Sequence, residues 1–85
     1  MSPFELPATQ EKMVVEIFKT DVTEAALAAR LVARLTARFK GCKFNFDLQD
    51  CDNILRAEGP QNHFQVQQII EILHRERQTC ERIAD

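Results

Sequence analysis

Residues 13 to 39 read MVVEIFKTDVTEAALAARLVARLTARF, a short apolar segment followed by a long alanine-rich one. The first seven residues are rich in β-branched and aromatic side chains, which favour a strand. The alanine-rich part has no Gly or Pro, and its apolar residues recur at steps of three and four, as on one face of a helix. The stretch therefore predicts a strand over 13–19 and a helix over 22–39, with Gly41 ending the helix.

The predicted strand has two faces, because side chains alternate along a strand. One face is wholly apolar and is expected to lie against the core, with Met13, Val15 and Ile17. The other face mixes a carboxylate with two hydrophobic residues and is expected to be only partly covered, with Val14, Glu16 and Phe18.

Two acidic residues mark the start of the predicted helix. Asp21 and Glu24 have the spacing of a capping box, in which each side chain accepts a hydrogen bond from the backbone amide of the other residue. Both carboxylates also lie at the positive end of the helix dipole. We therefore expect Asp21 to cap this helix.

A β-hairpin is predicted after the helix. Residues 43–48 and 54–58 flank a polar turn and read as two strands, and Gly59-Pro60 should end the second one. The side chains expected to face the core are Phe44, Phe46, Leu48, Leu55 and Ala57.

A second helix is predicted from His63 to about Glu76, with Asn62 as its cap. Its buried side should consist of Val66, Ile69, Ile70 and Leu73. Residues 78–85 fit either an extension of this helix or a short edge strand. The strand is the expectation that completes the fold.

The element order βαββαβ predicts an α+β protein with a ferredoxin-like sandwich, in which two helices cover one face of a four-stranded antiparallel sheet. We expect one domain over 13–85, preceded by an extended arm over 1–12. The chain of 85 residues carries a net charge of −2, which does not favour binding to nucleic acid or to an anionic membrane. There is no apolar run of the roughly 20 residues that a membrane span needs, and the first residues do not read as a signal peptide. We therefore expect a cytoplasmic protein.

The length, the element order and the junction of strand and helix resemble the heavy-metal-associated domain, the fold of copper chaperones. The resemblance covers 13–85 and is strongest to small stand-alone bacterial relatives, in which the hairpin reads much like residues 46–52, FDLQDCD. That family binds Cu(I) or similar soft ions through a Gly-Met-x-Cys-x-x-Cys loop. Here the loop, FKTDVTE over 18–24, has no cysteine, and Asp21 and Glu24 stand where the two cysteines would be. Carboxylates suit hard ions and not soft ones, so the family's metal activity is not expected.

The fold would bring the connections at one end of the sheet together. A divided site of Cys51, Cys80 and His74 there could hold Zn or Cu, because zinc takes sulfur and nitrogen ligands. The alternative is a polar turn, a histidine at a helix end and a small buried thiol. Three hairpin carboxylates could supply oxygen ligands for calcium, Asp47, Asp50 and Asp52, but their spacing is not that of a calcium loop.

Two surfaces are candidates for contact with a partner. Arg30, Arg34 and Arg38 repeat every four residues and form a basic stripe on the first helix. The sheet face away from the helices should carry Val14, Phe18 and Ile54. No motif of a catalytic site is present. We therefore expect a non-catalytic module without a cofactor that binds a protein partner or forms a homodimer, and that does not act on nucleic acid or membranes. The alternative is a metal carrier or sensor that uses Cys51 with Cys80 or His74.

Overall fold

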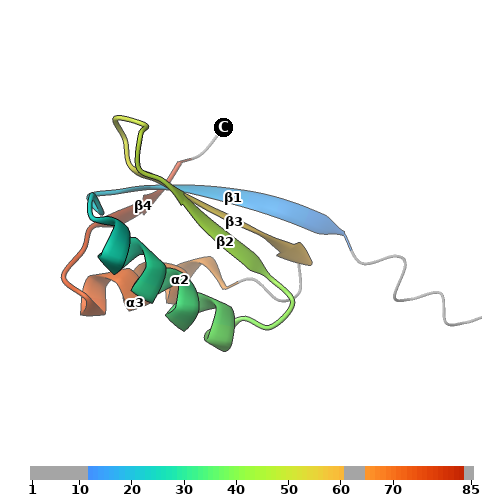
Figure 1. Ribbon diagram of the computed structural model, residues 1–85. Coiled ribbons are helices and arrows are strands. Elements are labelled where there is room, and N and C mark those ends of the chain that lie inside the picture. Colours follow the sequence, from blue (N-terminus) through green and yellow to red (C-terminus); the bar gives the residue numbers. More distant parts are fainter. Residues whose placement is uncertain (1–11, 61–64, 84–85) are drawn as a thin grey trace, which may run out of the picture.

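The computed structural model describes residues 12–60 and 65–83. Its elements are β1 (Met13–Thr20), α2 (Ala25–Arg38), β2 (Lys43–Asp47), β3 (Ile54–Pro60), α3 (Val66–Arg75) and β4 (Cys80–Arg82). The strands form one antiparallel sheet in the order β2-β3-β1-β4, and both helices lie on the same side of it (Figure 1). The predicted ferredoxin-like α+β fold is confirmed, and so is the final strand. The predicted arm, apart from Lys12, lies outside the described residues, and so do Asn62 and His63. The predicted start of the second helix at His63 was too early, because α3 begins at Val66 with Gln65 as its cap residue.

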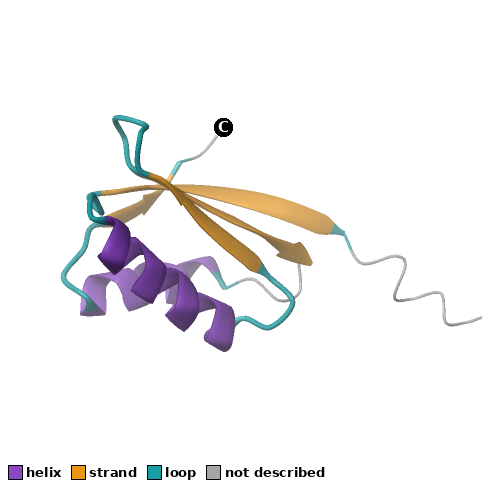
Figure 2. Ribbon diagram, in the orientation of Figure 1, coloured by secondary structure: helices purple, strands orange, loops and turns teal. Residues whose placement is uncertain are grey.

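The core lies between the sheet and the two helices. Its largest fully buried side chains are Phe18, Val22, Leu31, Leu35, Leu55, Ile69 and Leu73. The predicted buried sides of α3 and the hairpin are confirmed, because their members are buried or pack against this cluster. The apolar stripe of α2 is also buried, with Ala28, Leu31 and Leu35 in the core. The opposite face of the sheet, called the open face below, has neither helix over it (Figure 2).

The prediction for the two faces of β1 was wrong. Phe18 is completely buried, whereas Met13 and Val15 are 60% and 45% exposed. The strand register explains this result, because Phe18 lies opposite Leu55 of β3. Residues directly opposite each other on neighbouring strands share a face, and Leu55 points into the core. Met13, Val15 and Ile17 therefore belong to the open face.

Strand β3 continues through Gly59-Pro60, although this pair was predicted to end it. The pairing with β2 stops at Glu58, so the last two residues of β3 pair only with β1. Proline is tolerated where a strand lacks a neighbour on one side. Gly59 is required for another reason: a Cβ atom there would lie 2.7 Å from Cys42 Sγ.

A residue with positive φ lies shortly after the end of each helix. Gly41 (φ 84°) follows α2, as expected. Helix α3 has no glycine at its end, and Arg77 adopts the left-handed conformation instead (φ 65°). The Gln78 amide then donates to the Leu73 carbonyl at 3.0 Å. This turn reverses the chain and directs it into β4.

Candidate functional site

The connections β1–α2, β2–β3 and α3–β4 meet at one end of the sheet, as the fold predicted. Thr20, the last residue of β1, is buried and joins two of them. Its hydroxyl donates to the Asn53 carbonyl (2.6 Å) and accepts from the Val22 amide (3.2 Å). Asn53 adopts φ 48°, a conformation that asparagine tolerates better than most residues. These bonds fix the hairpin turn against the start of the β1–α2 loop.

Asp21 and Glu24 do not form the predicted capping box. Helix α2 begins at Ala25, with Glu24 as its cap residue and no hydrogen bond from a capping side chain. The Asp21 carboxylate instead accepts from the Thr79 amide at 2.9 Å. Asp21 thus ties the β1–α2 loop to the segment that leads into β4, and the two residues at the family's metal positions do not act together.

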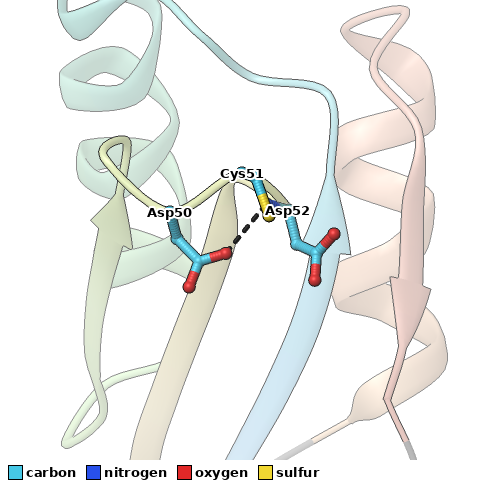
Figure 3. Close-up of side chains that lie close together, drawn as sticks. All are labelled: Asp50, Cys51 and Asp52. Atoms are coloured by element: carbon cyan, nitrogen blue, oxygen red, sulfur yellow. Dashed lines mark hydrogen bonds between the residues drawn. The ribbon is translucent and has the colours of Figure 1, made fainter.

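The hairpin turn carries a group of potential metal ligands, which Figure 3 shows close together on one side of the turn. One ligand atom from each of Asp50, Cys51 and Asp52 lies within 4.8 Å of the others. The Asp50 carboxylate also accepts from the Asp52 amide at 2.8 Å, and Asp52 lies 3.8 Å from the Lys19 ammonium. Such bonds are typical of an acidic turn, and they hold the group in place without an ion.

The structure does not bring Cys51, Cys80 and His74 together as a group of ligands within the described part of the chain. Cys51 is exposed on the hairpin turn, and His74 is exposed near the end of α3. Cys80 is only 7% exposed and lies opposite Thr20 in the sheet. Burial raises the pKa of its thiol to about 12, so at neutral pH it is protonated and poorly suited to bind a metal. Asp47, the third hairpin carboxylate, accepts from the Gln49 amide and lies outside the group formed by Asp50, Cys51 and Asp52.

Thiol reactivity should follow this burial. We expect iodoacetamide at pH 8 to modify Cys51 alone in the native protein and all three cysteines after unfolding. With a pKa of about 12, roughly one Cys80 thiol in ten thousand is ionised at that pH, and burial raises the pKa of Cys42 as well. Intact-mass spectrometry counts the adducts, and Cys51→Ser should remain unmodified. Rapid labelling of native Cys80 would contradict its place in the core.

The arginine stripe on α2 is engaged with α3. Arg30 and Arg34 both contact the Glu76 carboxylate, at 3.3 and 3.2 Å. Arg38 donates to the Gln68 side chain at 2.7 Å. The two helices are therefore bridged along their polar sides, while the Arg30 and Arg34 side chains remain 64% and 54% exposed.

The open face carries a row of apolar side chains that the sequence assigned to the core. Met13, Val15 and Ile17 follow one another along β1, and Ile83, 39% exposed, continues from β4 beside Ile17. Both faces of β1 are largely apolar, so the alternation of side chains along the strand does not show which face lies against the core. Of the predicted contact residues, half-buried Val14 and buried Phe18 face the helices, and only Ile54 lies on the open face.

A scan of protein-family models, a search of curated proteins and a search of solved structures each found no match to the chain. The resemblance to the heavy-metal-associated domain therefore stays a prediction. None of the described helices is sufficiently long and apolar to cross a membrane.

Proposed function

We propose that this chain is a non-catalytic protein-association module that binds its partner through the open face. The observation that carries the proposal is the apolar row on β1, in which Met13 and Val15 are 60% and 45% exposed. Ile17, Ile83 and Ile54 lie on the same face of the sheet as this row. Exposed apolar areas of this kind mark interaction sites on soluble proteins.

The charges on the open face favour a polypeptide over a nucleic acid. Three cations and three anions share the face, because these side chains lie in register with the apolar row: Lys19, Lys43, Arg56, Asp47, Glu58 and Glu81. They cancel in number, whereas surfaces that bind nucleic acid are strongly basic. The described part of the face also has no aromatic side chain on which a base could stack, because Phe18 points into the core. The partner we infer is an extended polypeptide with apolar side chains.

The proposed function assumes the fold of the heavy-metal-associated domain but does not include that family's metal binding. Two observations support this choice. The Asp21 carboxylate is engaged with the Thr79 amide, and the Cys80 thiol is buried opposite Thr20.

The test uses a phage-displayed library of random peptides, selected against the purified chain. We expect the selected peptides to have apolar side chains and to bind Met13→Gln/Val15→Thr at least tenfold more weakly than the wild-type chain. Both substitutions replace exposed side chains, and threonine keeps the preference for a strand, so the fold should be retained. Fluorescence anisotropy with labelled peptides measures the affinities.

Glu58→Gln is the matched control, because Glu58 lies opposite Val15 on the same face but contributes no apolar surface. It should bind the peptides within about twofold of the wild-type chain. If the selected peptides bind the double variant as tightly as the wild-type chain, the binding surface lies elsewhere and the proposal fails.

A further inference from the structure

Strand β2 forms one edge of the sheet, and its outer side is uncovered within residues 12–60 and 65–83. It pairs with β3 on one side only. A hollow of about 830 Å³ adjoins this edge. It is lined by all five residues of β2, by Cys42 and Thr36, and by four residues of β1 and β3 on the open face: Ile17, Ile54, Arg56 and Glu58. An edge of this kind exposes unpaired backbone groups that can pair with another strand.

The residues of β2 are arranged symmetrically about Asn45. In an antiparallel pairing of two copies centred on this residue, Lys43 lies opposite Asp47 of the second copy, and the same contact forms again on the other side of the centre. Phe44 lies opposite Phe46 in the same way. Registers that are shifted by one residue place either Lys43 or Asn45 opposite Phe46, and these shifts mismatch the two faces of the strand. Only the register centred on Asn45 forms both Lys43–Asp47 pairs and also keeps the matching faces of the two strands on the same side of the sheet.

The helix beside this edge also presents an uncharged surface. A groove of about 310 Å³ runs between α2 and the hairpin, and its lining has no charged residue. It is formed by Ala25, Ala28, Ala29, Val32, Phe44, Asn45, Phe46 and Leu48. The arginines of α2 contact α3 residues instead. The small side chains Ala25 and Ala29 would let the corresponding helix of a second copy approach closely.

We propose that two copies of this chain join through their β2 edges, in the antiparallel register centred on Asn45, to form one continuous eight-stranded sheet. The matching charges of Lys43 and Asp47 identify the second copy as the occupant. The contact lies along the edge of the sheet and leaves the apolar row on β1 free. This interface is therefore separate from the one in the proposed function.

Cysteine cross-linking tests the register directly. In a Cys51→Ser background, Asn45→Cys should form a disulfide-linked dimer under mild oxidation, because opposed Cα atoms in an antiparallel pair are about 4.5–5.5 Å apart, within the range of a disulfide. Asp47→Cys is the matched control on the same strand and face. In the proposed register the two copies of residue 47 are about 14 Å apart, so this variant should remain monomeric on a non-reducing gel.

Charge reversal gives a second measurement, in which folding is checked independently by circular dichroism. Lys43→Glu and Asp47→Lys should each weaken dimerisation by about tenfold or more in sedimentation equilibrium, because each change creates two like-charge contacts. The double variant Lys43→Glu/Asp47→Lys should restore the wild-type affinity. Lys19→Glu, on the same face but on β1, should have little effect.

Equal cross-linking of the Asn45→Cys and Asp47→Cys variants, or no recovery in the double charge variant, would overturn the proposal. Met13→Gln/Val15→Thr separates the two interfaces, because it should weaken peptide binding and leave cross-linking through Asn45→Cys unchanged. Failure of one proposal can thus be recognised without affecting the other.

Discussion

Phe18→Ala is expected to lower the free energy of unfolding by about 3–5 kcal/mol, the usual cost of removing a phenyl ring from a packed core. Phe18 is completely buried opposite Leu55. The matched control is Met13→Ala on the same strand but on the open face, and it should change stability by no more than about 0.5 kcal/mol. Urea denaturation followed by circular dichroism measures both variants, since the chain has no Trp or Tyr for fluorescence.

A domain of this size can be unfolded outright by such a loss. Phe18→Leu therefore accompanies the alanine variant and should give a smaller loss in the same direction. If Met13→Ala is the more destabilising change, the two faces of β1 are the reverse of those described.

Thr20→Val should lower the free energy of unfolding by about 1–3 kcal/mol, although the two side chains have nearly the same shape. Thr20 is buried, and its hydroxyl serves the Val22 amide and the Asn53 carbonyl at once. Valine can do neither, so the buried Val22 amide loses its partner. The measurement is again urea denaturation, with hydrogen exchange at Val22 as a local readout.

Thr20→Ser retains the hydroxyl and is the control for this change. It should recover most of the stability that Thr20→Val loses, and it should keep the Val22 amide protected from exchange. An equal loss in both variants would show that the methyl group, and not the pair of hydrogen bonds, is what this position requires.

The element order could be read from the sequence because helix and strand periodicities are local properties. The faces of β1 could not, because the side of the sheet on which Glu16 lies depends on a distant residue. Glu16 is on the helix side, where its carboxylate accepts from Arg82 of β4 at 2.6 Å. No pattern along β1 indicates that this partner will be present.

The candidate site shows the same limit. That the connections meet at one end of the sheet follows from the topology, and this prediction is confirmed. The bonds within it join residues far apart in the chain, such as Asp21 with Thr79. The sequence around Asp21 favours a capping box. In the structure, however, the Asp21 carboxylate accepts from the distant Thr79 amide. Cys80 was expected near the same end, but its orientation into the core depends on its pairing with Thr20.

The strand order also bears on how the chain folds as it is synthesised. Strand β1 is made first, yet it lies between β3 and β4, which are made later. On a nascent chain both apolar faces of β1 remain without strand partners until these segments leave the ribosome. Phe18 can meet Leu55 only after β3 has been translated, and Thr20 can pair with Cys80 only after β4 has been translated. The sheet is therefore completed only when β4 is available, and until then β1 carries apolar side chains without their strand partners, a state that favours aggregation.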